Sequence, residues 1–238
     1  AGIGKLVLID RDVVELSNLQ RQGLFGEADI GLPKAVQAKK RLGEINSEVE
    51  VVAQVEDVTS ENISRLVVAD VVVDGSDNME TRFLVNDLCK KEKRVWVYGA
   101  AVGDRGRVMT VYPGGPCFSC VFAGTRAVET CDTTGVLNTI THMVAAWQVG
   151  EVVKVLLKER EEPQLVVVDG WRGTVERIRV KRRQSCAACC GRYEYLEGRK
   201  MARAVVLCGT GRYQVRTGEN DLKEMRKRLG KSEDVGDL

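Results

Sequence analysis

The amino-acid sequence predicts an α/β protein with a Rossmann-like mixed sheet and helices on both faces of that sheet. Its first half alternates short β-branched runs with helical patterns, which is typical of strands joined by crossover helices. The run at residues 66–73 is almost continuously apolar, as in a strand buried on both sides. From about residue 95, strand patterns follow one another without helices between them, so we expect the sheet to become antiparallel there.

Each element follows from a local pattern. Runs rich in β-branched residues predict strands over 6–9, 49–55, 71–73, 95–98, 108–112, 165–168 and 174–180. Pro33 opens a helix that ends near Asn46, because the N–H that proline lacks is not needed in a first turn. A second helix is expected over 80–93. A third, over 138–158, is expected deep in the core, with these side chains packed inward: Ile140, Val144, Trp147, Val152, Val155 and Leu156.

Composition indicates a globular protein with a sizeable core. The chain has 238 residues, of which 44% are apolar and 29% are charged, and its net charge is +2. This balance makes general binding to nucleic acid unlikely. No apolar stretch approaches the roughly 18 to 20 residues that a membrane span requires, so no membrane association is expected. The sequence shows no secretory signal, and the expected location is therefore cytoplasmic.

The sequence divides at about residue 200. Residues 1–200 are expected to form one domain that includes the paired cysteines described below. Residues 201–238 are expected to form a small C-terminal α+β appendage, with two strands around a Gly-Thr-Gly turn and a helix over 219–229. No function follows from the residues of this appendage.

Four of the eight cysteines form two C-x-x-C pairs, Cys117 with Cys120 and Cys186 with Cys189. Each pair can place two thiolates on one tetrahedral Zn²⁺, and four sulfurs leave no open coordination position. The two pairs therefore predict a structural zinc knuckle. Buried free thiols or a redox pair are the alternative, and Cys190 is an alternative to Cys189 as a ligand.

Polar residues follow two of the predicted strands, where α/β sheets place their ligands. Asp10 can accept the hydroxyls of a ribose, Arg21 can meet phosphate oxygens, and Lys34 lies in the first turn of its helix, where anions are favoured. The segment 74–78 closes another strand with two carboxylates, which form an oxygen cluster of the kind that Mg²⁺ prefers next to phosphates. Each of these residues alone also has an ordinary explanation as a turn aspartate, a surface charge or a helix cap.

In this order, the motifs resemble the ThiF/MoeB/HesA family, the prokaryotic relatives of ubiquitin-activating enzymes. The resemblance covers residues 1 to about 190. Its motifs are Asp10-x-Asp12, Ser17-Asn18-Leu19-x-Arg21-Gln22, Gly31-x-Pro33-Lys34-Ala35, Asp74-x-x-Asp77-Asn78 with Arg82, and the two C-x-x-C pairs. The resemblance implies an adenylyltransferase that uses ATP to adenylate the C-terminal glycine of a ubiquitin-like sulfur-carrier protein similar to MoaD or ThiS, with release of pyrophosphate.

The resemblance also implies residue roles. Asp10 would hold the ribose of ATP, whereas Asn18, Arg21 and Lys34 would contact its phosphates and Asp77 would ligate Mg²⁺. The whole nucleotide-binding set is then Asp10, Asp12, Asn18, Arg21, Gln22, Lys34, Asp77 and Asn78. Residues 129–136 resemble the crossover loop of the family, which in several members carries a cysteine that forms a thioester, persulfide or acyl disulfide. Whether Cys131 does so here is left open.

The implied cofactors are ATP, Mg²⁺ and Zn²⁺, and the implied partner is a carrier protein that ends in Gly-Gly. A sulfurtransferase is a further candidate partner, and relatives of this kind are usually homodimers. Members of the family begin with a strand and a glycine-rich loop, and Gly2 and Gly4 cannot replace that loop. We therefore expect a segment before Ala1 and poor ATP turnover by the polypeptide alone.

Two other functions remain as alternatives. The first is a non-catalytic, zinc-bound scaffold that binds a ubiquitin-like carrier. The absence of the glycine-rich loop favours it, whereas Arg21, Lys34 and Asp77 oppose it. The second is an NAD-dependent oxidoreductase, which explains the sheet but leaves the cysteine pairs unexplained.

Overall fold

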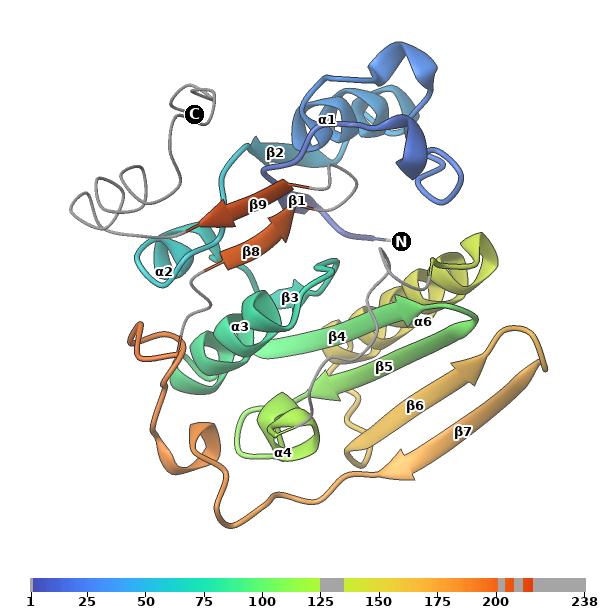
Figure 1. The fold of residues 1–238 in the computed structure, drawn as a ribbon. Coiled ribbons are helices and arrows are strands. Elements are labelled where there is room, and N and C mark those ends of the chain that lie inside the picture. Colours follow the sequence, from blue (N-terminus) through green and yellow to red (C-terminus); the bar gives the residue numbers. More distant parts are fainter. Residues whose placement is uncertain (1, 125–134, 201–203, 208–211, 216–238) are drawn as a thin grey trace. The chain divides into compact units, whose positions relative to one another are not determined.

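A five-stranded mixed sheet crosses the first of the two compact units into which the chain divides, Ala1–Lys200 and Met201–Leu238 (Figure 1). The computed structural model describes residues 2–124, 135–200, 204–207 and 212–215. The strands are β1 Lys5–Ile9, β2 Glu50–Gln54, β3 Val71–Val73, β4 Val95–Val102, β5 Arg105–Val111, β6 Gln164–Asp169, β7 Thr174–Arg179, β8 Ala204–Leu207 and β9 Arg212–Val215. The helices are α1 Lys34–Ile45, α2 Ile63–Leu66, α3 Met79–Lys91, α4 Phe118–Phe122 and α6 Asn138–Leu156, with 3-10 turns at Leu16–Asn18, Glu27–Asp29 and Ala188–Cys190. None of the described helices has the length and apolar character needed to cross a membrane.

The five-stranded sheet changes from parallel to antiparallel pairing at β4. β3 pairs with β4 in parallel, whereas β4, β5, β6 and β7 follow one another in antiparallel pairs. This confirms the predicted mixed sheet. β1 and β2 form a separate parallel pair, so the first unit holds two sheets where the sequence predicts one. Within the described residues, no strand pairs with both β1 and β3 to join the two sheets.

Helices cover both faces of the five-stranded sheet, as the sequence predicts (Figure 1). α6 packs across β3, β4 and β5 on one face, and α3 contacts β4 on the other, where it also packs against α4. α1 covers the β1–β2 pair. In the second unit, β8 and β9 form an antiparallel hairpin, while the helix predicted over 219–229 lies outside the described residues.

The apolar run at residues 66–73 is not one strand. It begins with the last residue of α2 and continues through a bend, and only Val71–Val73 is a strand. The amide of Asn62 fixes the turn before α2, because it accepts the N–H of Thr59 at 2.8 Å and donates to the carbonyl of Asp57 at 2.7 Å. Leu66 packs with residues of α3 instead of pairing in the sheet. Burial on a helix therefore explains the apolar pattern at the start of the run.

The prediction that α6 lies deep in the core is wrong, although four of the side chains predicted to face inward pack in or against an apolar cluster on this face of the sheet, namely Ile140, Val144, Trp147 and Val152. The buried residues of α6 are Ile140, Val144 and Gln148, which are spaced four apart and form one stripe against the sheet. Leu156, predicted to face inward, is 44% exposed, and other apolar residues of α6 are exposed as well, namely Met143 and Val149. A helix that packs on one face of a sheet buries only one stripe, however apolar its other side is.

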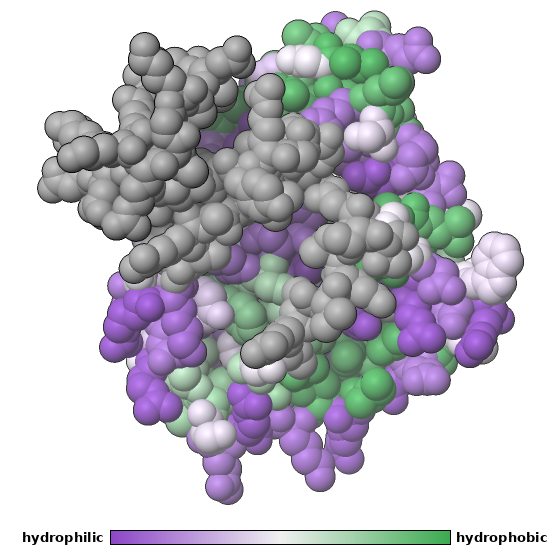
Figure 2. Space-filling view, viewed as in Figure 1, coloured by the Kyte–Doolittle hydropathy of each residue, from purple (hydrophilic) through white to green (hydrophobic). Residues whose placement is uncertain are grey.

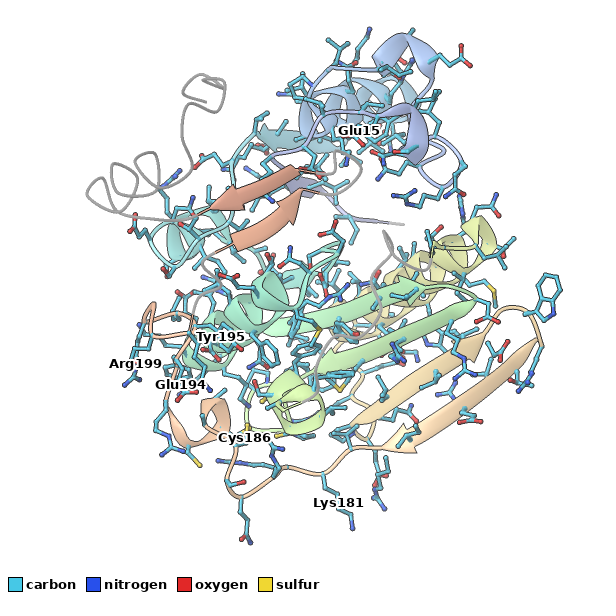
Figure 3. The ribbon with its side chains drawn as sticks, viewed as in Figure 1. Glu15, Lys181, Cys186, Glu194, Tyr195 and Arg199 are labelled. Atoms are coloured by element: carbon cyan, nitrogen blue, oxygen red, sulfur yellow. The ribbon has the colours of Figure 1, made fainter. Side chains whose placement is uncertain are left out.

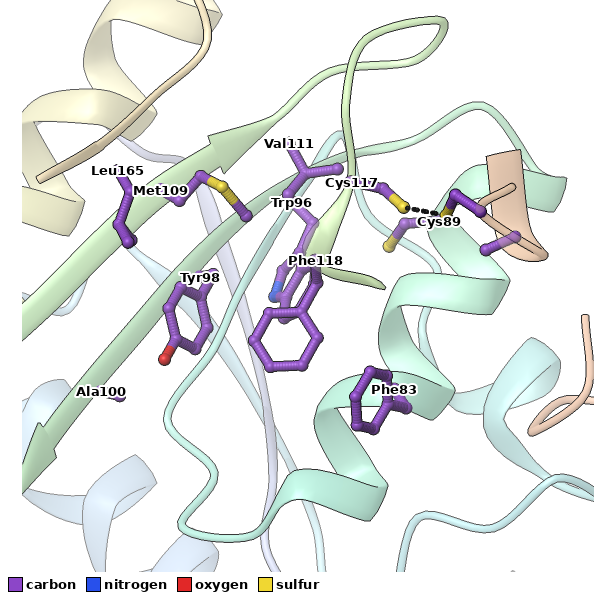
Figure 4. Packing of buried hydrophobic residues seen from close by; sticks show 12 residues of the cluster. Phe83, Cys89, Trp96, Tyr98, Ala100, Met109, Val111, Cys117, Phe118 and Leu165 are labelled. Carbon is purple, nitrogen blue, oxygen red and sulfur yellow. Dashed lines mark hydrogen bonds between the residues drawn. The ribbon is translucent and has the colours of Figure 1, made fainter. Parts of the chain in front are cut away.

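Aromatic side chains fill the core between β4, α3 and α4 (Figure 4). Phe118, the first residue of α4, is fully buried and packs against Trp96 and Tyr98 of β4. Phe83 of α3 meets the Phe118 ring edge-on, with ring centroids 5.0 Å apart. Cys117 and Cys186 belong to the same buried cluster, so the paired cysteines lie at the border of this core.

The chain returns to α3 after the last paired cysteine. The ring of Tyr195 stacks on Phe83 at 4.8 Å, and the backbone N–H of Tyr195 donates to Asp87 Oδ2 at 2.9 Å. Figure 3 shows Tyr195 beside α3. Asp87 is 2% exposed, and this burial raises its pKa from 3.8 to about 6, although hydrogen bonds from Tyr195 and Leu196 oppose the rise.

Asp87→Asn is expected to remove part of the pH dependence of stability. Because the folded-state pKa of Asp87 lies above its ordinary value, the wild type loses stability as the pH rises from about 4 to about 6. The rise corresponds to about 3 kcal/mol. Asparagine keeps an acceptor for the Tyr195 N–H without a charge. Urea unfolding at several pH values should therefore show the variant gaining stability over the wild type across this window. The exposed variant Asp70→Asn should track the wild type, and equal curves for Asp87→Asn would contradict the prediction.

Candidate nucleotide and metal sites

Asp10 stands directly after β1 in a turn that holds its carboxylate. Its N–H donates to the carbonyl of Gln54 at 3.1 Å, which continues the pairing of β1 with β2 by one residue. Its Oδ1 accepts the N–H of Asp12 at 2.8 Å. Burial raises the pKa of Asp10, while this hydrogen bond and the charge of Lys34 lower it. The carboxylate is thus held in one orientation at the end of the strand.

Lys34 presents an ammonium group at the start of α1. Its side chain is 12% exposed, and its Nζ lies 3.2 Å from Oδ2 of Asp12. Its backbone N–H donates to the carbonyl of Asp12 at 2.9 Å, so the loop after β1 and the start of α1 are joined twice. A cation and a helix N-terminus at one point favour an anion there.

The loop between β1 and α1 holds buried amides whose oxygens lack a partner. Asn18 is 5% exposed, and in the described part of the chain its Oδ1 and the Oε1 of Gln22 accept no hydrogen bond. Arg21 donates to the carbonyl of Ser17 at 3.0 Å. Because buried polar atoms are normally paired, these oxygens fit a ligand that donates hydrogen bonds. A ribose hydroxyl or a base amine is such a donor, whereas a phosphate oxygen would need the nitrogen of the Asn18 amide.

The turn after β3 separates two carboxylates. Asp74 is buried, and its Oδ1 accepts the N–H and the hydroxyl of Ser76 at 2.8 and 2.6 Å. Its Oδ2 lies 3.3 Å from Nε of Arg82, whose charge opposes the rise in the Asp74 pKa that burial causes. Asp77 is exposed. Asn78 caps α3 by accepting the N–H of Thr81 at 2.8 Å, and its Nδ2 donates to Asp77.

These residues stand in two groups. Burial is the main cause of the raised pKa of Asp10, and the negative charges of Asp12 and Asp77 add to it, so Asp77 lies within electrostatic range of Asp10. Lys34 acts on Asp10 in the opposite sense and pairs with Asp12. Arg21, Asn18 and Gln22 lie in the loop that leads from β1 to α1, and Cys131 lies outside the described residues. The sequence analysis gave Arg82 no role of its own, and the structure shows that it pairs with Asp74. Its position one turn after the helix cap Asn78 is the feature of the sequence that could have indicated a contact with the turn.

The four paired cysteines form one cluster. The Sγ atom of Cys117 lies 3.9 Å from that of Cys120, 3.6 Å from that of Cys186 and 3.5 Å from that of Cys189, and Cys120 lies 3.6 Å from Cys189. A tetrahedron with zinc–sulfur bonds of 2.3 Å has edges of about 3.8 Å. The cluster therefore fits Zn²⁺. Cys190 is exposed and directs its thiol to the carbonyl of Gln184, so Cys189 is the member of the cluster.

Local structure holds both cysteine pairs. Cys117 precedes α4 and its carbonyl accepts the N–H of Cys120 at 2.9 Å, while Asn86 of α3 accepts the N–H of Phe118. The second pair lies in the 3-10 turn Ala188–Cys190 and the segment before it. Figure 2 shows hydrophilic side chains along the lower edge of the view, over the segment that leads there from β7, and Figure 3 shows Lys181 in this segment pointing outward.

The four thiols influence one another's protonation. Hydrogen bonds among them, first of all from Cys117, lower the pKa of Cys120 and that of Cys186, the latter to about 6, whereas the pKa values of Cys117 and Cys189 are raised. The backbone N–H of Arg183 also reaches Cys120 Sγ at 3.5 Å. Thiolates are the form of cysteine that binds zinc, so a bound cation would displace the remaining protons from the cluster.

A Rossmann-like fold with charged residues at its strand ends and a four-thiol cluster beside its core has the features of a zinc-stapled nucleotide-binding protein. The model of the ThiF family matches residues 1–188, and the chain belongs to this family.

Three relatives show which proteins the chain is similar to. It is 40% identical over 240 residues to the sulfur carrier protein ThiS adenylyltransferase of Bacillus subtilis, a match that covers 96% of this chain and 71% of that protein. It is 39% identical to the SAMP-activating enzyme E1 of Haloferax volcanii over 79% of this chain and 72% of that protein. It is 37% identical to the adenylyltransferase and sulfurtransferase MOCS3 of Aedes aegypti, of which the match covers 45%.

Solved structures agree with the fold. The crystal structure of E. coli MccB with MccA-N7isoASN superposes with a TM-score of 0.71 at 23% sequence identity, over 79% of this chain and 61% of MccB. The structure of MccB with ATP gives a TM-score of 0.68 at 22% identity. At this identity the similarity supports the fold alone.

Cys120→Ser is expected to lower zinc content and thermal stability together. The loss of one ligand from a four-sulfur site removes most of the binding free energy, which is also folding free energy, so Tm should fall on the order of 10 °C. Zinc content is measured by mass spectrometry and Tm by differential scanning calorimetry. Cys190→Ser is the matched control, because its thiol lies next to the cluster but outside it, and it should keep both values. A Cys120→Ser protein that lacks zinc and is equally stable would refute the structural zinc site.

Proposed function

We propose that this protein is an ATP-dependent adenylyltransferase that activates the C-terminal glycine of a ubiquitin-like sulfur-carrier protein. The observation that carries the proposal is that Lys34 and Asp77 both lie within electrostatic range of Asp10 at the end of β1, so that a cation and two carboxylates would be available to one nucleotide. The names of the Bacillus and Haloferax relatives support the same activity.

The proposed reaction needs no general base from the protein. The attacking group is the carboxylate of the carrier's terminal glycine, which is already ionised, and it attacks the α-phosphorus of ATP with pyrophosphate as the leaving group. Lys34 and Arg21 would bind the phosphate oxygens and neutralise their charge, so that the carboxylate can approach. To do so, the ammonium of Lys34 would exchange the carboxylate of Asp12 for a phosphate oxygen.

The remaining residues would orient the nucleotide and its metal ion. Asp10 would accept the ribose hydroxyls, with Asn18 and Gln22 as further partners for the nucleoside. Asp77 would hold Mg²⁺, which when bound neutralises phosphate charge, and its exposure leaves room for the ion. Asp12 would keep Lys34 in place through its backbone carbonyl, which accepts the Lys34 N–H, and Asn78 would support Asp77 through the bond from its Nδ2.

Further partners and a location follow as proposals. A carrier that ends in Gly-Gly is the proposed substrate, and a sulfurtransferase would act after adenylation, with Cys131 as the candidate cysteine for the transfer. The cytoplasm stays the predicted location. We also propose a homodimer that covers the exposed apolar side of α6, which includes Met143, Val149 and Leu156.

Asp77→Asn is expected to lower ATP–pyrophosphate exchange at least about 100-fold, because the loss of a metal ligand removes charge stabilisation from the reacting phosphate. Exchange is measured on the full-length protein with a Gly-Gly carrier. Since the Asp77 side chain is exposed, the unfolding midpoint should stay the same. Asp70→Asn, another exposed carboxylate variant, should keep full exchange. Unchanged exchange in Asp77→Asn would exclude the magnesium assignment, and no exchange in the wild type with any such carrier would exclude the proposed function.

Val149→Glu is expected to dissociate the proposed dimer, because it places a charge in an apolar interface. Val149 is 52% exposed, so the substitution should leave the fold of the subunit intact. Sedimentation equilibrium should show a dimer dissociation constant at least about tenfold higher than that of the wild type. Val175→Glu, at a similarly exposed valine of β7, is the matched control and should remain dimeric. A wild-type protein that sediments as a monomer at all concentrations would contradict the dimer.

A further inference from the structure

Gln148 is a buried polar residue on the apolar stripe of α6. The stripe consists of Ile140, Val144 and Gln148, and the first two pack in an apolar cluster against the sheet. Gln148 is 6% exposed. A buried amide destabilises the fold unless its hydrogen bonds are made, so the partners of Gln148 explain its presence there.

Those partners are two backbone carbonyls, that of Asp74 directly after β3 and that of Val97 within β4. Nε2 of Gln148 donates to the carbonyl of Asp74 at 2.9 Å and to that of Val97 at 3.1 Å. The Val97 carbonyl also accepts the N–H of Asp74 at 3.0 Å. Only the nitrogen of an amide can face two carbonyl oxygens, so the orientation of the side chain is determined. Gln148 thereby ties the first residue of the turn after β3 to its neighbour strand.

Gly99 of β4 leaves the space that this amide occupies. A Cβ atom at Gly99 would lie 2.4 Å from Cδ and Nε2 of Gln148, which is too close for any pair of heavy atoms that are not bonded. The absence of a side chain at Gly99 thus allows the amide to lie flat against the strand. Glycine inside a strand often marks such a close approach.

The turn that Gln148 ties carries Asp77, three residues further along the chain. β3 has only three residues, so it anchors this turn weakly. The side chains of Arg82 and Asn78 fix the turn from α3, which lies on the opposite face of the sheet from α6. The hydrogen bond from Gln148 holds the turn from the other face of the sheet, where α6 lies.

We propose that Gln148 is a positioning residue, which holds the turn over residues 74–77 in the conformation that binds ATP with Mg²⁺. It would not touch the nucleotide itself. The claim that the held turn binds ATP with Mg²⁺ rests on the proposed function, whereas the claim that Gln148 holds the turn does not. The two claims therefore need separate measurements.

The first measurement is hydrogen exchange of backbone amides in the protein without nucleotide. Gln148→Met keeps the shape of the side chain but removes the donor, so the amides of Asp74 and Ser76 should exchange about tenfold faster. Val144→Ala is the matched control. Val144 lies one turn earlier on the same buried stripe, where it packs in an apolar cluster with Val97 and Val108, and this variant removes apolar volume but no hydrogen-bond donor. It should leave the exchange of Asp74 and Ser76 unchanged relative to amides of β6.

Gly99→Ala tests the same contact from the other side. The new Cβ would displace the end of a flexible side chain and not the backbone, so this variant should fold even if Gln148→Met does not. It should also speed exchange at Asp74 and Ser76. If exchange at these amides is unchanged in both variants, or if Val144→Ala speeds it equally, the inference is overturned.

The second measurement is calorimetric binding of ATP at increasing Mg²⁺ concentration. In Gln148→Met the Mg²⁺ concentration for half-maximal binding should rise several-fold, whereas Val144→Ala should bind as the wild type does. Unaltered Mg²⁺ dependence in Gln148→Met, with a wild type that binds ATP, would overturn the positioning of the metal turn. A wild type that binds no ATP would instead exclude the proposed function, and the hydrogen exchange result would still decide whether Gln148 holds the turn.

Discussion

Three buried polar side chains of α3 set the constraint on which both candidate sites depend, because each needs a partner from a different segment. Arg82 pairs with Asp74 in the turn after β3, Asn86 accepts the N–H of Phe118 at the start of α4, and Asp87 accepts the N–H of Tyr195 after the last paired cysteine. An unpaired buried polar group costs about 1 to 3 kcal/mol. α3 therefore holds the proposed metal turn through Arg82, and it holds the segments next to the two cysteine pairs through Asn86 and Asp87.

The thiol cluster completes what α3 begins. The two cysteine pairs are about 70 residues apart in the chain, and between them lie α6 and the strands β6 and β7. A cation bound by all four sulfurs would close this long loop, and the closure of a long loop restricts the unfolded chain the most. The cluster lies beside Phe118 and Trp96, so the same closure would also protect the aromatic core. Its place there suits a structural site and leaves the charged residues at the strand ends for chemistry.

Local patterns were sufficient to predict most elements and the thiol cluster. The β-branched runs give β1, β4 and β6, because strand formation depends on side-chain shape over a few residues. The C-x-x-C spacing gives the thiol cluster, since two residues between cysteines bring both sulfurs to one side of a turn. The polar segments after β1 and β3 indicate the residues proposed to bind the nucleotide, because polar side chains at strand ends are not needed for packing. All of these signals are short-range.

What the sequence does not predict depends on contacts between distant segments. The start of the run at residues 66–73 is apolar because the end of α2 packs on α3, and the sequence pattern of the run does not reveal this cause. The exposed side of α6 is as apolar as its buried stripe, so periodicity does not reveal which side faces the sheet. The burial of Gln148 is explained only by Gly99, which leaves space for its amide, and by the carbonyl of Asp74, which accepts its hydrogen bond. These residues lie about 50 and 70 positions earlier in the chain. Similarly, the two carboxylates of one turn differ in their surroundings, because Arg82 pairs with Asp74, which is buried, whereas Asp77 is exposed. Tertiary packing thus decides which carboxylate is buried in an ion pair and which is accessible, and the motif alone does not reveal it.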